Sequence, residues 1–184
     1  GLARLALDAI EGNGFTGDVM AYYGHEIYVK AITPWVDAYS GRNEVVVNEV
    51  GDLTRIADLG PTRFVAVGDP GEIETLETRL LGAHDSSLHI TRSLAHFCEV
   101  LHPDGGKDKA LAQLCNRLAV KPDEVVAIGN GWNDVHMLRW AGLGIATADA
   151  VKEALAAADR IARPVEEDGV AKVLEGLLAQ GLFS

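Results

Sequence analysis

Cysteine is scarce in this chain, and long apolar runs and secretion signals are missing. Cys98 and Cys115 are the only two cysteines in 184 residues, both lie among apolar residues, and their spacing matches no metal-binding motif. We therefore exclude a disulfide framework and expect two reduced core thiols in a cytoplasmic protein. No apolar run approaches the ~18 residues that a membrane span needs, and no signal-peptide pattern is present. These absences argue against the membrane and secreted classes of protein.

An excess of basic charge is also lacking. The chain has 16 Lys and Arg against 27 Asp and Glu, a formal net charge of −11, and both halves are acidic. Proteins that bind nucleic acid or anionic lipid over a broad surface need clustered Lys and Arg, so we expect neither partner. An enzyme that handles phosphate remains compatible, because its site needs only a local cation. A hydrophobic fraction of 48% is enough for a folded core.

The order of predicted elements changes near residues 93–96 and suggests two domains, 1–95 and 96–184. The first part predicts an α+β domain with helices over 2–10 and 73–81 and strands at 18–23, 26–30, 44–50, 62–67 and 87–91. The second part alternates strands at 97–101, 125–128, 143–146 and 160–162 with helices over 107–118, 133–140, 150–158 and 170–178. Such alternation is typical of βαβ units in a parallel sheet, whose ligands bind at the carboxyl ends of the strands.

One of these strand ends carries a polar turn, Gly129-Asn130-Gly131-Trp132-Asn133-Asp134. The side chains of its two asparagines and its aspartate can point at one spot. Asn or Asp at the start of a helix satisfies backbone amides that would otherwise lack partners. The positive end of the helix dipole also favours a phosphate. The turn therefore predicts a phosphate site, with a purely structural cap as the alternative.

The turn is part of a longer ordered pattern. Together with Met137-Leu138 it resembles the fourth motif of haloacid dehalogenase-like phosphatases, G-D-x-x-N-D-x-x-M-L. The stretch 104–111, Asp-Gly-Gly-Lys-Asp-Lys-Ala-Leu, is similar to the G-x-x-K-G-x-A-L segment of the Cof-type, sugar-phosphatase-like branch, which carries the lysine of motif three. Residues 141–146, 150–158 and 166–170 also resemble that branch, in the same order.

The resemblance implies an α/β fold, a haloacid dehalogenase-like Rossmannoid parallel sheet with a smaller α+β cap domain. Residues 96–184 would be the C-terminal part of that core, and residues 1–95 resemble the α/β (C2) cap inserted in the family. The implied activity is Mg²⁺-dependent hydrolysis of a phosphomonoester through an aspartyl-phosphate. The implied partner is a small phosphorylated metabolite such as a sugar phosphate, over which the cap closes.

The resemblance also assigns roles to residues of the second part. Lys107 would offset the charge of the phosphoryl group. Asn133 would donate to the phosphate or orient the lysine, and Asp134 would hold the lysine or the water shell of the metal. Trp132 would help to shape the substrate site at its mouth. Asn130 stands where the family usually has a metal-binding aspartate, and its uncharged amide is expected to weaken Mg²⁺ binding.

A second departure concerns the nucleophile. The family takes it from an N-terminal D-x-D segment, and the 184 residues contain no D-x-D. We therefore expect a truncated phosphatase that begins inside the cap and is inactive by itself. The alternative is a non-catalytic relic that serves as a binding or assembly module, and a third option is an unrelated α/β domain that holds an anion. A parallel sheet without its first strand exposes an edge, so we also expect a homodimer or strand exchange to cover it.

Overall fold

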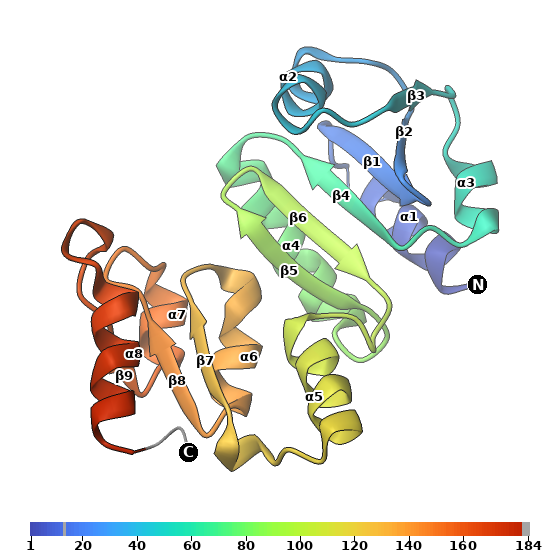
Figure 1. Ribbon diagram of the computed structural model, residues 1–184. Helices are drawn as coiled ribbons and strands as arrows, with labels where there is room; N and C mark the ends of the chain where they lie inside the picture. Colours follow the sequence, from blue (N-terminus) through green and yellow to red (C-terminus); the bar gives the residue numbers. More distant parts are fainter. Residues whose placement is uncertain (13, 182–184) are drawn as a thin grey trace. The chain divides into compact units, whose positions relative to one another are not determined.

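The computed structural model describes residues 1–12 and 14–181, and the chain divides into two compact units (Figure 1). The first comprises Gly1–Gly105 and the second Gly106–Ser184. The division follows residue 105, whereas the sequence placed a boundary near residues 93–96. The strand at 97–101 accounts for the difference, because it hydrogen-bonds within the sheet of the first unit and not with the parallel strands of the second.

Six strands form the sheet of the first unit, in the order β3-β2-β1-β4-β6-β5 (Figure 1). They are β1 (Asp18–Tyr23), β2 (Glu26–Val29), β3 (Val47–Glu49), β4 (Arg63–Val67), β5 (His89–Leu94) and β6 (Phe97–Leu101). Neighbouring strands are antiparallel, except that β2 and β3 are parallel. The β5–β6 hairpin pairs with β4 through β6, and this pairing makes β6 a central strand.

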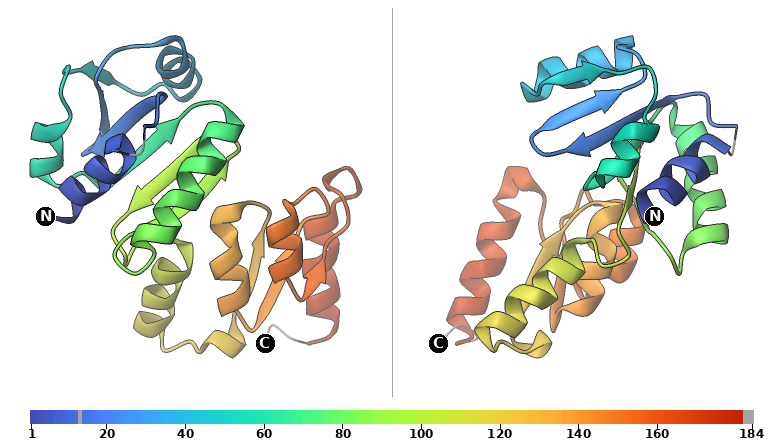
Figure 2. Two further views of the ribbon diagram at one scale, coloured as in Figure 1. Left: turned by 180° about the vertical axis from the view of Figure 1, so that it is seen from behind. Right: turned by 90° about the vertical axis from the view of Figure 1, so that its right-hand side faces the viewer.

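Helices cover the two faces of this sheet unequally (Figure 2). The main core lies on the face that packs against α1 (Leu2–Gly12), α3 (Thr54–Leu59) and α4 (Pro70–His84). The other face packs against α2 (Pro34–Asn43) in a smaller cluster. Successive strand residues point to opposite faces. In β1, Val19 and Ala21 therefore enter the main core, whereas Met20 enters the smaller cluster.

The sequence analysis did not predict α2 or α3. α2 buries a single residue, Val36, and contains Gly41, so its apolar stripe is too weak for a helical period to be recognised. α3 has only six residues. Local hydrogen bonds mark the start of these helices instead. The side chain of Thr33 accepts a hydrogen bond from the backbone N–H of Val36 at 3.4 Å, and a proline follows it at the first helical position.

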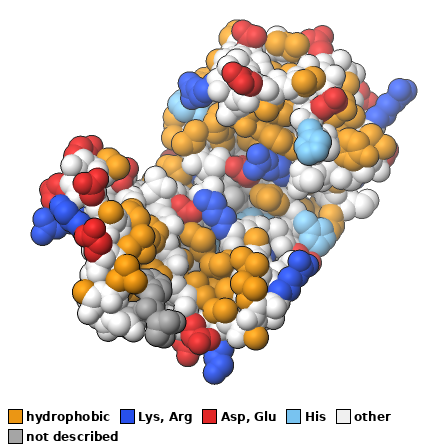
Figure 3. Space-filling view, in the orientation of Figure 1, with side chains coloured by type: hydrophobic (Ala, Val, Ile, Leu, Met, Phe, Trp, Pro, Cys, Tyr) orange, Lys and Arg blue, Asp and Glu red, His pale blue; other side chains and the backbone are white. Residues whose placement is uncertain are grey.

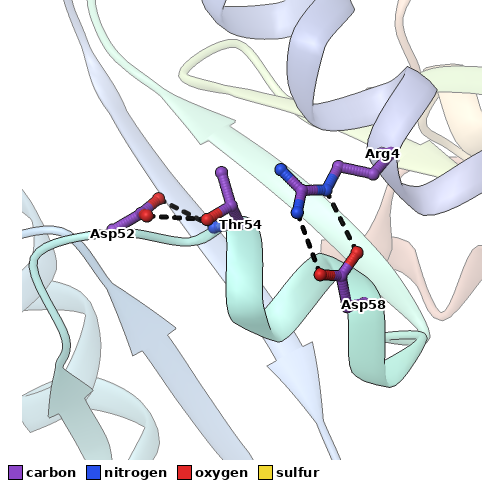
Figure 4. Close-up of polar contacts among 4 residues, drawn as sticks. All are labelled: Arg4, Asp52, Thr54 and Asp58. Atoms are coloured by element: carbon purple, nitrogen blue, oxygen red, sulfur yellow. Dashed lines mark hydrogen bonds and ion pairs between the residues drawn. The ribbon is translucent and has the colours of Figure 1, made fainter.

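Polar contacts fix α3 at both ends (Figure 4). The carboxylate of Asp52 accepts hydrogen bonds from the backbone N–H of Thr54 at 2.9 Å and from its hydroxyl at 2.6 Å. Arg4 of α1 donates through Nε and Nη2 to the two carboxylate oxygens of Asp58, at 3.1 and 2.9 Å. Exposed ion pairs add little stability. The fork geometry nevertheless sets the orientation of α3 against α1.

The second unit contains three parallel strands in the order β7-β8-β9, as the sequence predicts. They are β7 (Val126–Gly129), β8 (Leu143–Ala146) and β9 (Arg160–Ile161). The helices are α5 (Lys107–Leu118), α6 (Val135–Trp140), α7 (Lys152–Ala157) and α8 (Gly169–Ala179), with short 3-10 turns η1 (Pro122–Glu124), η2 (Trp132–Asp134) and η3 (Val165–Glu167). One apolar cluster joins β7 to α6 and α7, and another joins β8 to α8. Helices therefore cover both faces of an α/β sheet.

β7 forms one edge of this sheet, because among the described residues it pairs with β8 alone.

Both cysteines are buried, Cys98 in the first unit and Cys115 in the second. Burial raises the pKa of the Cys98 thiol to about 12, so this group stays protonated at neutral pH. Within the described part of the chain, no helix has the length and apolar character needed to cross a bilayer.

Candidate active site

The polar turn predicted from the sequence lies at the carboxyl end of β7 (Figure 1). β7 ends at Gly129, the 3-10 turn η2 occupies Trp132–Asp134, and α6 begins at Val135. The helix predicted from residue 133 therefore starts two residues later, after a tighter turn. Open α/β sheets bind their ligands at this end of the strands.

Asp134 organises the turn. Only 3% of the surface of Asp134 is exposed to solvent. Its Oδ2 accepts hydrogen bonds from the backbone N–H groups of Asn130 at 2.8 Å and Gly131 at 2.9 Å, and its Oδ1 accepts one from Nζ of Lys107 at 2.5 Å. The carboxylate thus satisfies amides of the loop before η2, whereas it makes no capping hydrogen bond to α6. One side chain holds the loop and the start of α5 together.

Gly129 makes room for this carboxylate. A Cβ at position 129 would lie 2.5 Å from the Cβ of Asp134 and 2.7 Å from its Cγ. Only glycine lets a strand end approach a side chain so closely without displacing it. The β7 sequence therefore ends in glycine because the buried aspartate occupies the space that a side chain would need.

Lys107 is the first residue of α5 and brings a partly exposed cation to the buried carboxylate. The lysine side chain is 50% exposed, whereas that of Asp134 is 5% exposed. Burial opposes ionisation of Asp134, but the hydrogen bonds from Lys107, Gly131 and Asn130 outweigh it and lower the pKa of the carboxyl. The pair is thus an ionised aspartate beside an ammonium group that still faces solvent and can contact a second anion.

The other predicted site residues lie on the same turn with fewer contacts. Asn130 is exposed, and its backbone, not its side chain, contacts Asp134. The side chain of Asn133 is partly buried and has no hydrogen-bond partner within the described residues. Trp132 is partly buried at the start of η2. The structure therefore brings Lys107 and Asp134 together, and the functional roles of all five residues remain predictions.

Asp108, the neighbour of Lys107, is not among the site residues predicted from the sequence. Its side chain is 13% exposed, and its Oδ1 is buried without a hydrogen-bond partner among residues 1–12 and 14–181. Nζ of Lys109 lies 3.9 Å from the other carboxylate oxygen. The signal was present in the sequence, because the G-x-x-K-G-x-A-L segment has glycine where this chain has aspartate. Compared with the family pattern, the second unit thus has a carboxylate in place of glycine at position 108 and an amide in place of a carboxylate at position 130.

These residues do not by themselves make a Mg²⁺ site. Within the described part of the chain, no group of three His, Cys, Asp or Glu side chains could hold a metal ion. Both oxygens of Asp134 already accept hydrogen bonds, and the amide of Asn130 carries no charge. Hard cations prefer several carboxylate ligands.

Comparison with known proteins identifies the family. The sequence pattern of haloacid dehalogenase-like hydrolases matches residues 6–174. The chain belongs to this family. The fold agrees, since a structure described as a sugar phosphatase of haloacid dehalogenase subclass IIB superimposes with a TM-score of 0.76 at 20% identity, covering 99% of this chain and 66% of that one. The resemblance and the α/β fold class predicted from the sequence are therefore confirmed.

Two curated relatives are similar to parts of this chain. A Haemophilus influenzae protein is 35% identical over 127 residues, which are 69% of this chain and 48% of that protein. The 5-amino-6-(5-phospho-D-ribitylamino)uracil phosphatase YwtE of Bacillus subtilis is 31% identical over 96 residues, 52% of this chain and 34% of that enzyme. The chain thus spans half or less of the length of these relatives.

Proposed function

We propose that this family member acts as a phosphatase on a small phosphomonoester, with a sugar phosphate as the candidate substrate. The Lys107–Asp134 pair at the carboxyl end of β7 carries the proposal. A half-exposed ammonium, held by a buried carboxylate, is suited to bind the oxygens of a phosphoryl group. Relatives support the substrate class, since one is a phosphatase of a ribityl phosphate and one structural neighbour is a sugar phosphatase.

Each residue of the turn has a distinct task in this proposal. Lys107 binds the phosphoryl oxygens and offsets the charge that develops on them during transfer. Asp134 is a positioning residue that holds the ammonium of Lys107 and fixes the loop amides. The amide of Asn133 donates to the phosphate, and Trp132 borders the substrate. The first unit acts as the cap that closes over the substrate and selects it.

Mg²⁺ is part of the proposal through the family alone, because phosphatases of this family generally use it. The residues of this chain do not complete a site for the ion, as Asp134 is fully engaged and Asn130 is neutral. At an effective dielectric of about 20, a charge pair at 4 Å is worth roughly 4 kcal/mol, so an amide at position 130 removes a large part of the attraction for a cation. We assign no catalytic step to the metal in this chain.

A hydrolysis assay tests the proposal. We expect the 184 residues alone to release no phosphate from p-nitrophenyl phosphate above background, because they contain no D-x-D nucleophile segment. Fusing the D-x-D strand of a family phosphatase to the N-terminus should restore turnover. Lys107→Ala in this fusion should then lower kcat/KM by about 100-fold or more, the usual cost of removing one electrostatic contact to the transition state.

Lys109→Ala is the matched control, because Lys109 lies on the same helix turn and its ammonium lies 3.9 Å from the carboxylate of Asp108. It should leave kcat/KM within a factor of about three, as exposed charges have small effects. Turnover by the unmodified chain that disappears in Lys107→Ala would show that a nucleophile had been overlooked. A folded but inert fusion would contradict the phosphatase proposal and favour a binding role.

A non-catalytic binding or assembly module is the second candidate. The neutral Asn130 and the unpaired edge of β7 favour it. An exposed strand edge presents free N–H and C=O groups that pair readily with another strand. On this proposal two copies of the chain associate through β7. Light scattering after size exclusion should give the mass of a dimer, and Ile128→Pro should shift it to that of a monomer. A monomer at all concentrations would contradict this association.

A further inference from the structure

A small pocket in the first unit is lined by residues that play no part in the candidate active site. It lies between the C-terminal half of α2 and the β5–β6 hairpin and has a volume of about 230 Å³. Its lining residues are Tyr39, Arg42 and Asn43 of α2 and Ser93, Leu94 and Phe97 of the hairpin. Drug-sized ligands occupy pockets of about 300–1,000 Å³, so this pocket suits a smaller molecule with a single ring or a short branched chain.

The walls of the pocket are apolar and fixed in place. The rings of Tyr39 and Phe97 meet edge to face, with centroids 5.6 Å apart. The hydroxyls of Tyr39 and Tyr22 are hydrogen-bonded at 2.7 Å. Burial and this contact raise the pKa of Tyr22, so the Tyr22 hydroxyl brings no negative charge to this region. Figure 3 shows hydrophobic side chains gathered on the face that carries α2 and β6. The walls therefore favour an apolar or aromatic ligand body.

Ser93 adds a polar group on one side of the pocket. The register of the β5–β6 pair shifts between Arg92 and Leu94, so Ser93 is the extra residue of a β-bulge. Bulges redirect a side chain away from the regular alternation and are frequent beside binding sites. Within the described residues the Ser93 hydroxyl has no hydrogen-bond partner, and it lines the pocket. It can therefore donate to a ligand oxygen.

Arg42 and Asn43 of α2 supply further polar groups to the pocket lining. Arg42 forms no ion pair with any described carboxylate, although the unit is acidic. The side-chain amide of Asn43 donates a hydrogen bond to the backbone carbonyl of Tyr39 at 2.8 Å. The side-chain oxygen of Asn43 has no hydrogen-bond partner within the described residues. Both residues lie in the last turn of α2, where the helix dipole is negative. The negative end of the helix dipole repels anions, and it repels a doubly charged anion more than a singly charged one. A ligand with a single negative charge is therefore better suited to pair with the guanidinium of Arg42.

From these contacts we propose that this pocket binds a small organic carboxylate with an apolar or aromatic body. The guanidinium of Arg42 pairs with the carboxylate, the Ser93 hydroxyl donates to it, and Tyr39, Phe97 and Leu94 surround the ligand body. The residues that line the pocket all belong to Gly1–Gly105, and none of them is assigned a role in the proposed phosphatase chemistry. An assay of binding therefore tests it even if the phosphatase proposal fails.

The test is an NMR titration of the ¹⁵N-labelled 184-residue chain with benzoate, benzyl alcohol and phenyl phosphate as probes. Benzoate should shift the amide signals of residues 39–43 and 93–97 in a saturable way. Benzyl alcohol should bind at least about tenfold more weakly, because hydrogen bonds to a charged group are stronger than those between neutral groups. Phenyl phosphate should bind no more tightly than benzoate.

Arg42→Gln should weaken benzoate binding by about tenfold, for the same reason. Arg55→Gln is the matched control, because Arg55 is an exposed arginine of α3 in the same unit that does not line the pocket. It should leave the affinity unchanged. Shifts confined to other residues, equal loss in both variants, or tighter binding of phenyl phosphate would each overturn the proposal.

Discussion

Gly129→Ala should lower the free energy of unfolding of the second unit by about 3 kcal/mol. The added methyl group would lie 2.5 Å from the Cβ of Asp134 and 2.9 Å from its Oδ2. Real side chains do not approach so closely, so the carboxylate must leave its place. The backbone amides of Asn130 and Gly131 then lose their acceptor, and each buried unpaired group costs about 1–3 kcal/mol.

Urea unfolding provides the measurement for this substitution. Trp132 and Trp140 report on the second unit once Trp35 has been replaced by phenylalanine. Gly176→Ala is the matched control, because Gly176 lies inside α8 and, outside the backbone of that helix, no atom of the described residues lies within 4 Å of where its Cβ would be. That substitution should raise stability by about 0.5–1 kcal/mol, since glycine is a poor helix former. Equal, small effects of both substitutions would contradict the role assigned to Gly129.

The second large effect is expected in the first unit. Glu77→Ala should lower its free energy of unfolding by about 3–5 kcal/mol, the usual cost of leaving one partner of a buried ion pair behind. Nε of Arg92 on β5 lies 2.7 Å from Oε2 of Glu77 on α4, and the two side chains are only 11% and 14% exposed. Without the carboxylate, the guanidinium stays in a site shielded from water.

A double-mutant cycle separates the free-energy cost of leaving the Arg92 charge unpaired from the loss of packing contacts of the Glu77 side chain. Replacing both partners, as Glu77→Leu with Arg92→Met, should recover at least half of the loss, because no charge is then left unpaired. Glu74→Ala, an exposed position on the same helix, should stay within about 0.5 kcal/mol of the original chain. Unfolding can be followed by Trp35 fluorescence in a background lacking the other tryptophans. A double substitution as damaging as Glu77→Ala would contradict this account.

The sequence predicted the fold best where apolar periodicity is strong. The helix expected over 107–118 matches α5 to the residue, and the three parallel strands of the second unit lie where the alternation places them. It predicted least where local hydrogen bonds or pairing decide the structure. α2 starts from a Thr33 cap, and β6 joins the antiparallel sheet through its partners in β4 and β5. Neither feature produces a period that can be read along the chain.

The candidate site, like the fold, was predictable from the sequence only in part. The order of motifs was enough to predict that Lys107 and Asp134 belong to one site, and the structure joins them. The sequence could not show that the Asp134 carboxylate accepts hydrogen bonds from the backbone amides of Asn130 and Gly131, because a backbone donor does not depend on the type of residue that carries it. Asp108 was overlooked for a different reason. Its departure from the glycine of the family segment is visible in the sequence, but an acidic residue at a helix start is usually solvated, and the burial of Asp108 is seen only in the structure.

The contacts of Asp134 also have a consequence for how the second unit folds. They connect Lys107 with a loop that follows it by more than twenty residues, across the helix α5 and the strand β7. The carboxylate can accept all its hydrogen bonds only after both elements have docked. Asn130 and Gly131 should therefore exchange their amide hydrogens only when the docked pair opens, although they lie in a surface turn. The geometry of this turn thus has the cooperativity of the core and not that of a loop.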